Sequence, residues 1–327
     1  MPEDIPLKPE LPEALRDAAF RGKLVPFIGA GVSTLAGCPT WEQLADGALR
    51  WLVEQGHFTH AQLDQLKTLN PRIKLSIARG FEQQHVTPIP FKELLRSAAR
   101  GANERGSRIY SSLWRLANTF VTTNYDEWLD GARAASQPSV QGGTDASATL
   151  APAPRAVYFK RDDLTSAHLN QQNAVLHLHG SVNDPAGMVI TTSDYVEHYR
   201  NDRLGEENPV LTFLENLFRT KHVLFIGYSL SELEILEYVI LKTREFRTEG
   251  LQPRHFIVQG FFSHELELKT SLEGYYNQCG IGLLPFLKDH KGHEQLLDVI
   301  EDFVARAPAA PLMLADEFQE MERWLDD

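Results

Sequence analysis

Short apolar runs separated by helical patterns recur along the chain. The clearest runs cover residues 25–28, 119–123, 174–178, 223–226, 255–258 and 281–284, and a weaker one covers 188–192. Continuous apolar runs of this length are typical of strands that are buried on both faces, as in parallel sheets. Helical spacing of apolar residues follows most of the runs, for example in 194–200 and 209–218. The alternation predicts an α/β fold: a Rossmann-like parallel sheet with helices on both faces.

Residues 42–116 depart from this alternation because their pattern is helical throughout. Leu44, Ala48 and Leu52 repeat at three-to-four spacing after Trp41, and several prolines divide the segment into separate helices. No strand pattern interrupts it. The predicted domains are a Rossmann-like domain of residues 1–41 and 117–306, an inserted helical module of 42–116, and a C-terminal tail of 307–327.

The predicted tail has the pattern of a short amphipathic helix. Leu314, Phe318, Met321 and Leu325 repeat at three-to-four spacing, and acidic residues fill the opposite side. Two interpretations remain open. The apolar stripe packs either on its own domain or on a neighbouring subunit or partner.

A glycine turn joins the first predicted strand to a helix. Gly29, Ala30 and Gly31 let the backbone turn sharply and approach another group closely, and Ser33 can cap the helix. Free N–H groups at a helix N-terminus bind anions, so a phosphate or a pyrophosphate is the expected ligand. The motif alone is not specific, because the same glycines can serve strand–helix packing. Thr34 also stands where the dehydrogenase fingerprint requires a third glycine.

Four predicted strands end in small or polar residues. These ends are Gly29-Ala30-Gly31, Thr123-Asn124-Tyr125-Asp126, His179-Gly180-Ser181 and Gly227-Tyr228-Ser229. In an open parallel sheet, ligands bind beyond the carboxyl ends of the strands. We therefore expect these four segments to line one ligand site.

Composition narrows the classes of function. The chain has 327 residues, 43% of them hydrophobic, and a formal net charge of −12. The negative charge argues against nucleic acid as a direct ligand, since phosphate backbones require clustered Lys and Arg. No run approaches the about 18 apolar residues of a membrane span, and no signal sequence is evident, so we expect a cytoplasmic protein. Two cysteines, Cys38 and Cys279, cannot form a disulfide framework or a four-cysteine zinc site.

Taken in order, these motifs resemble the sirtuins, and more closely the bacterial sirtuin-like NAD hydrolases of phage-defence systems. The resemblance covers about residues 15–304. It is carried by the glycine turn with Gly37, Pro39 and Trp41, by Thr122–Asp126, by Leu178–Ser181 and by Gly227–Leu230. It implies an NAD-binding Rossmann-like domain.

Two departures from the protein-deacylating sirtuins affect the expected reaction. Those enzymes carry a four-cysteine zinc module, which this chain cannot build. The segment Gly37–Trp41 also lacks their Asp-Phe-Arg ending. Both departures put peptide deacylation in doubt and leave NAD binding intact.

The candidate catalytic residues are Asn124 and His179. A histidine with a pKa near 6.5 suits proton transfer around neutral pH, and an amide can orient water or a ribose hydroxyl without adding charge. The candidate cofactor-binding residues are Gly29, Ala30, Gly31, Ser33, Asp126, Gly227 and Ser229, with no metal. For Asp126, contact with the nicotinamide amide is what the resemblance implies.

Each candidate also has a structural alternative. Asn124 and Asp126 could cap a short helix through Trp128, and His179 could be a buried structural histidine. His177 is assigned a structural role rather than a role in a metal pair with His179.

The resemblance implies an NAD hydrolase that releases nicotinamide and ADP-ribose as a regulated effector of anti-phage defence. A homo-oligomer and a separate activating protein are expected, the latter an ATPase, a short Argonaute or a nucleotide-signal enzyme. The alternatives are an NAD-dependent deacylase or ADP-ribosyltransferase, and a non-catalytic sensor of NAD or ADP-ribose.

Overall fold

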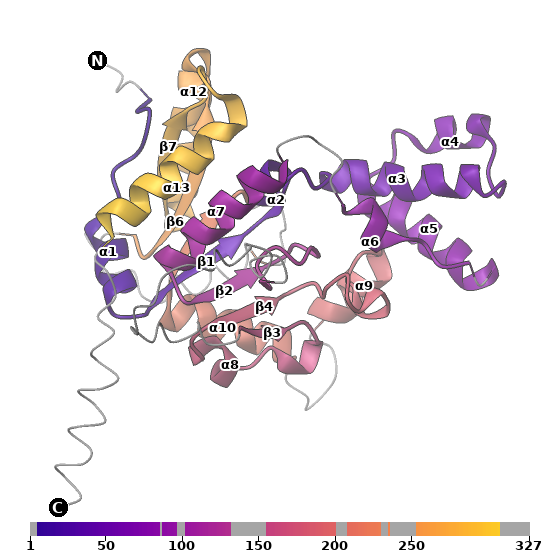
Figure 1. Ribbon diagram of the computed structural model, residues 1–327, viewed down its shortest axis with the longest axis horizontal. Helices are drawn as coiled ribbons and strands as arrows, with labels where there is room; N and C mark the ends of the chain where they lie inside the picture. Colours follow the sequence, from indigo (N-terminus) through magenta and orange to yellow (C-terminus); the bar gives the residue numbers. More distant parts are fainter. Residues whose placement is uncertain are drawn as a thin grey trace, which may run out of the picture.

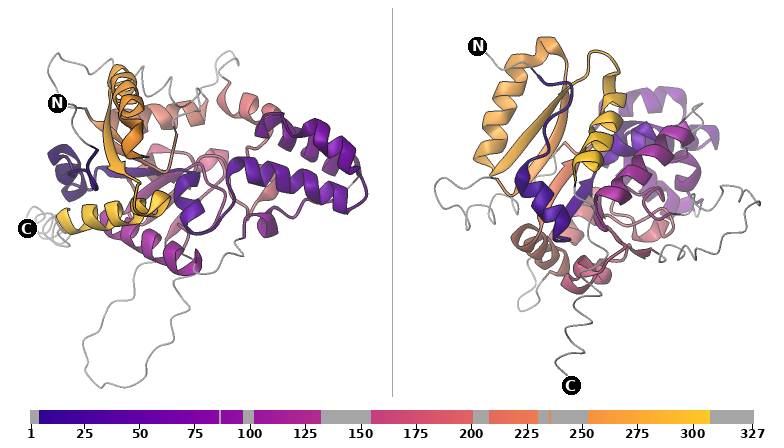
Figure 2. Two further views of the ribbon diagram at one scale, coloured as in Figure 1. Left: turned by 90° about the horizontal axis from the view of Figure 1, so that it is seen from above. Right: turned by 60° about the vertical axis from the view of Figure 1, so that its left-hand side comes forward.

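A seven-stranded parallel sheet forms the centre of the molecule (Figures 1 and 2). The computed structural model describes residues 5–85, 87–96, 102–131, 155–200, 208–229, 235 and 253–307. The strands are β1 (Leu24–Ile28), β2 (Thr119–Thr122), β3 (Ala156–Tyr158), β4 (Ala174–His177), β5 (His222–Ile226), β6 (His255–Phe261) and β7 (Ile281–Leu287). Their order is β3-β4-β2-β1-β5-β6-β7, and every pairing is parallel. The predicted fold class is therefore confirmed.

The order of the strands reverses beside β1. The chain passes from β1 to β2 and β4 on one side and later returns to β5 on the other side. Ile28, at the end of β1, pairs with Thr122 of β2 and with Ile226 of β5, and Thr122 pairs with His177 of β4. The carboxyl ends of four strands are thus level. These ends lie at the topological switch point of the sheet, which is where open α/β sheets bind ligands.

Side chains alternate between the two faces of the central strands. Val25 and Phe27 of β1 lie in one apolar core with α10 (Pro209–Thr220), and helices α8 (Ser166–Asn170) and α12 (Leu266–Gln278) contribute to the same core. Leu24 and Ile28 lie in a second core. The helices of the second core are α1 (Glu13–Phe20), α2 (Ala30–Leu35), α7 (Ala102–Leu116) and α13 (Gln295–Arg306). Both faces are covered by helices, so the runs that form β1 and β5 are almost entirely buried.

A helical lobe projects from one side of the sheet (Figure 1). It consists of α3 (Trp41–Glu54), α4 (His60–Leu66), α5 (Pro71–His85) and α6 (Phe91–Leu94). The lobe has its own apolar core, which includes Leu44, Leu49 and Leu75 and also takes in Tyr125 and Ile190 from beyond the strand ends. Thr40 and Gln43 form a capping box that starts α3.

The helix α7 lies within the predicted module but packs on the body of the protein. Ile109, Leu113 and Leu116 belong to the second core of the sheet, and α7 lies against α13 and α2. The helical lobe therefore ends before α7. A helical pattern shows which positions are apolar, but not which of two cores they join.

Three local expectations differ from the structure. Residues 188–190 form an extended loop instead of a strand, and α9 (Thr192–Tyr199) begins directly after it. Trp128 and Leu129 lie in a turn, not in a short helix. The edge strand β3 was missed because its three residues are only partly buried and form no apolar run.

Several remaining features complete the description. Short 3-10 turns occupy η2 (Arg161–Asp163), η3 (Pro185–Gly187), η4 (Ser263–Glu265) and η5 (Gly292–Glu294). None of the helices in the described ranges is long and apolar enough to cross a membrane. The amphipathic segment of the predicted tail, 308–327, lies outside the described residues.

Candidate functional site

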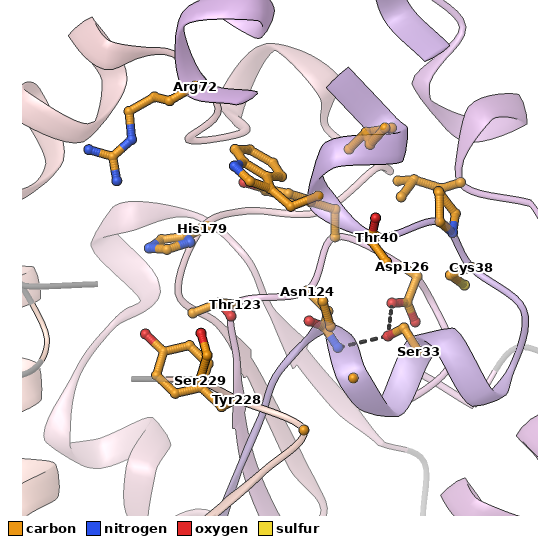
Figure 3. Close-up of a pocket in the computed structure, with 18 of the residues that line it drawn as sticks. Ser33, Cys38, Thr40, Arg72, Thr123, Asn124, Asp126, His179, Tyr228 and Ser229 are labelled. Atoms are coloured by element: carbon orange, nitrogen blue, oxygen red, sulfur yellow. Dashed lines mark hydrogen bonds between the residues drawn. The ribbon is translucent and has the colours of Figure 1, made fainter. Parts of the chain in front are cut away.

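A cavity of about 870 Å³ lies beyond the carboxyl ends of the central strands, against the helical lobe (Figure 3). Most of the predicted site residues line it: Ala30, Gly31, Ser33, Asn124, Asp126, His179, Gly227 and Ser229. Gly29 is buried beneath the turn and does not line the cavity. Segments that are as much as 200 residues apart in the sequence therefore meet at one place, as the strand ends predict.

Ser33 is the centre of a buried hydrogen-bond network. Its hydroxyl donates to Asp126 Oδ2 at 2.6 Å and accepts from Asn124 Nδ2 at 2.7 Å. The Tyr110 hydroxyl lies 3.0 Å from the same oxygen, and it must donate because the proton of Ser33 is already used. Burial, followed by the charge of Asp126, raises the pKa of Tyr110 well above its usual value, so this phenol stays neutral.

The side-chain amide of Asn124 has a fixed orientation. One Nδ2 proton goes to Ser33, and the other goes to the Gly29 carbonyl at 3.0 Å. With both protons committed, the amide oxygen lies on the side away from Ser33, at the cavity (Figure 3). Asn124 therefore presents an acceptor to a ligand, although an isolated amide offers both a donor and an acceptor.

Asp126 stabilises the loop that follows β2. Its Oδ1 accepts from the Trp128 amide at 3.1 Å, and its Oδ2 accepts from Ser33. Burial raises the pKa of Asp126, and these hydrogen bonds oppose that shift. The carboxylate thus caps a turn, as its structural alternative suggests, although no helix follows. Contact of Asp126 with a nicotinamide stays a prediction.

His177 supports Asn124 from within the sheet. Its Nδ1 lies 2.9 Å from the Asn124 carbonyl oxygen, and its Nε2 lies 2.8 Å from Asp130 Oδ1. Both partners are acceptors, so both ring nitrogens carry a proton and donate, and the ring is a positively charged imidazolium. Burial alone would lower the pKa of His177, but Asp130 outweighs it and the net shift is upward. Within the described residues, no group of three or more His, Cys, Asp or Glu side chains could hold a metal ion.

His179 lies in the wall of the cavity between two tyrosines. Its Nε2 is 2.7 Å from the Tyr199 hydroxyl, and its Nδ1 is 3.4 Å from the Tyr195 hydroxyl. Burial first, then the charges of His198 and Arg72, lowers the pKa of His179 well below 6.5. The ring is therefore neutral at physiological pH and can accept a proton, directly or through Tyr195.

The glycine turn is packed tightly against the end of β5. The Gly29 amide donates to Ile226 O at 2.9 Å, and the Gly31 amide donates to Gly227 O at 2.8 Å. A Cβ atom at Gly29 would lie 2.5 Å from Gly227 O, and one at Gly31 would lie 2.8 Å from Gly227 Cα. The two glycines thus serve the contact between two backbone segments, and their N–H groups are already used inside the protein.

Sequence reasoning missed several residues at the site. Arg72 and Tyr195 come from α5 and α9 and line the cavity opposite the strand ends. His293, in η5, places its Nε2 2.6 Å from the Gly31 carbonyl oxygen and so joins the turn before α13 to the glycine turn. The sequence offered one hint for these residues: Arg72 follows Pro71, a residue typical of helix starts, which places Arg72 in the first turn of a helix. It did not indicate that the Arg72 side chain lines the cavity.

Comparison with known proteins identifies the class to which this fold and site belong. A family model described as a SIR2-like domain matches residues 118–282, which is just over half of the chain. The chain therefore belongs to the SIR2-like domain family. Membership supports an activity that binds or uses NAD.

Two solved structures are also similar to this chain. One comes from work on the mechanism and regulation of Sir2 enzymes; it has 16% identity and a TM-score of 0.35, with 90% of this chain and 98% of that chain covered. The other is a complex of a Sir2 homologue with NAD; it has 10% identity and a TM-score of 0.38, with 93% of this chain and 96% of that chain covered.

Proposed function

We propose that this protein hydrolyses NAD to nicotinamide and ADP-ribose. The observation that carries the proposal is the fixed amide of Asn124, which presents its oxygen to a cavity at the switch point of a SIR2-like sheet. The likeness to a Sir2 homologue whose structure contains NAD agrees with the choice of ligand. The cavity, of about 870 Å³, falls within the range of small-molecule sites.

The chemistry required of the protein is modest. Nicotinamide leaves as a neutral molecule when its bond to the ribose breaks, and positive charge develops at the anomeric carbon. A water molecule adds to that carbon, and its proton passes to a base. The Asn124 oxygen can accept from the water or from a ribose hydroxyl, and the neutral His179 can receive the proton.

The two cysteines of the chain favour water over a protein substrate as acceptor. Cys38 and Cys279 are both buried and cannot form the four-cysteine module of the deacylating sirtuins. Deacylation, ADP-ribosyl transfer and NAD sensing without turnover are the alternatives. The resemblance to phage-defence proteins supports a regulated effector that depletes NAD after activation by a separate protein, in the form of a homo-oligomer.

The test is to incubate the purified protein with NAD, alone and with the products of neighbouring genes, and to separate the products by chromatography. Equal amounts of nicotinamide and free ADP-ribose are expected. Nicotinamide released together with ADP-ribosylated protein, detected by mass spectrometry, would indicate a transferase. Normal NAD binding without nicotinamide release under any of these conditions would refute hydrolysis.

The pKa of His179 predicts the pH profile of the reaction. A base acts in its neutral form, and a lowered pKa keeps that form dominant at pH 6.5 and above. The kcat/KM for NAD should therefore stay level around neutral pH and decline only as pH falls through the lowered pKa. Rates measured between pH 5 and 8 check this, with the exposed His60→Gln variant as a control that keeps the profile. An acid limb centred at or above 6.5 would contradict the role of His179.

A further inference from the structure

Three aromatic side chains of α9 surround the ring of His179. They are Tyr195, His198 and Tyr199, and their spacing of three and four residues places them on one face of the helix. All three meet the His179 ring edge to face: the ring centroids lie 5.0, 5.9 and 6.0 Å away, at interplanar angles of 62°, 77° and 87°. The helix α9 therefore restricts the orientation of the His179 ring.

The two ring nitrogens of His179 meet different tyrosines. Nε2 lies 2.7 Å from the Tyr199 hydroxyl, whereas Nδ1 lies 3.4 Å from the Tyr195 hydroxyl, which is long for a hydrogen bond. The described residues that line the cavity include His179 and Tyr195 but not Tyr199, which packs against the first apolar core. Nδ1 is thus the nitrogen on the cavity side, and Nε2 points away from the cavity.

The hydrogen bonds of a neutral imidazole decide which nitrogen carries its one proton. Burial, followed by the charges of His198 and Arg72, lowers the pKa of His179 and keeps the ring neutral. A buried N–H group needs a near acceptor, and the Tyr199 oxygen is nearer than the Tyr195 oxygen. A proton on Nε2 therefore has the better acceptor, and the lone pair of Nδ1 is then directed toward the cavity.

The contact with Tyr199 also serves the protonated ring. In the hydrolysis, an O–H bond of the water breaks, its oxygen bonds to the anomeric carbon, and its proton goes to Nδ1. The imidazolium that results carries a proton on each nitrogen, so Nε2 donates to the Tyr199 oxygen as a charged donor. Hydrogen bonds from charged donors are stronger than neutral ones. Tyr199 thus stabilises the ring more after proton transfer than before it, and such a difference accelerates a step.

We propose that Tyr199 is a positioning residue for the reaction: its hydroxyl oxygen accepts from Nε2 of His179 and so directs the lone pair of Nδ1 toward the ligand. The tautomer is a property of the folded protein alone. The use of that lone pair as a base rests on the proposed function.

The first experiment determines the tautomer of His179 in the full chain, without ligand or turnover. Nuclear magnetic resonance of isotope-labelled histidine nitrogens distinguishes a protonated nitrogen from an unprotonated one, and the signals missing from His179→Gln identify the ring. The wild type should carry the proton on Nε2. Tyr199→Phe should raise the share protonated on Nδ1, since the acceptor at Nε2 is lost. Tyr195→Phe should keep the wild-type tautomer.

The second experiment measures nicotinamide release at neutral pH. Tyr199→Phe should lower kcat by about 10- to 100-fold, the change expected when a hydrogen bond to a charged group is lost. Binding of ADP-ribose should be unchanged, because Tyr199 does not line the cavity. The control is Tyr158→Phe, which removes a hydroxyl from an exposed contact with Gln171 and should keep both kcat and the tautomer of His179.

The outcomes separate the two proposals. A proton on Nδ1 in the wild type, or on Nε2 alone in Tyr199→Phe, overturns the role of Tyr199. The wild-type spectrum provides this test even if Tyr199→Phe does not fold. Wild-type kcat in Tyr199→Phe also overturns the role of Tyr199 and leaves NAD hydrolysis standing. A wild type that releases no nicotinamide overturns the proposed function, and with it the use of His179 as a base.

Discussion

Replacement of Asn124 by alanine should lower the rate of nicotinamide release by about 100- to 10,000-fold, the usual range for a group that orients or exchanges a proton in the transition state. The variant loses the only oxygen that this side chain presents to the cavity, because both amide protons are bound to Gly29 O and Ser33. The measurement is the steady-state kcat and KM for NAD. The loss should be concentrated in kcat, with ADP-ribose binding retained.

The fold should survive this change at a measurable cost. Asn124 is buried, and its removal takes one donor from the Gly29 carbonyl, which keeps the Val32 amide, and one from the Ser33 hydroxyl, so a destabilisation of about 1–3 kcal/mol is expected. Asn216→Ala is the matched control, because Asn216 donates to Thr212 O on the exposed side of α10. Turnover within tenfold of the wild type in Asn124→Ala would disprove the catalytic assignment.

Replacement of Gly29 by alanine should cause a large loss of stability. The new Cβ would lie 2.5 Å from Gly227 O and 2.7 Å from Tyr228 Cα, which are backbone positions and cannot rotate away. The ends of β1 and β5 would have to separate at the centre of the sheet. A destabilisation of about 3 kcal/mol, at the upper end of overpacking effects, is expected from denaturant unfolding.

Gly80→Ala provides the comparison for this experiment. Gly80 lies in α5, and nothing would come within 4 Å of a Cβ there. Alanine favours a helix over glycine by about 1 kcal/mol, so this variant should be slightly more stable than the wild type. If Gly29→Ala unfolds at the same denaturant concentration as Gly80→Ala, the tight contact with Gly227 does not limit stability.

The sequence analysis correctly predicted that Gly31 must be small, but the structure gives a different reason for it. Gly31 was expected to need its small size for approach to a phosphate. In the structure, the group that approaches is Gly227, whose φ of +62° itself favours glycine. Gly31→Val therefore tests the packing of β1 against β5 before it tests ligand binding.

Strands buried on both faces were predictable from their composition. The runs at 25–28 and 223–226 became β1 and β5, because a strand covered by helices on both sides is apolar at every position. The run at 188–192 begins with three apolar residues, but Met188 and Ile190 fill the core of the helical lobe from an extended loop. An apolar run in the sequence predicts that its side chains are buried. It does not predict that its backbone pairs with a neighbouring strand, so a buried run can also be a loop.

The sequence by itself determined the parallel sheet, the level strand ends and the family, because these depend on periodicity and on residues adjacent in the chain. The tertiary structure alone decided how the site residues are used. The contact of Ser33 with Asp126 joins positions 93 residues apart, and Arg72 reaches Tyr195 from another helix. Hydrogen bonds of this kind form only after packing has fixed both partners. Packing therefore committed the amides of Gly29 and Gly31 to the fold and placed Arg72 of the helical lobe in the wall of the cavity.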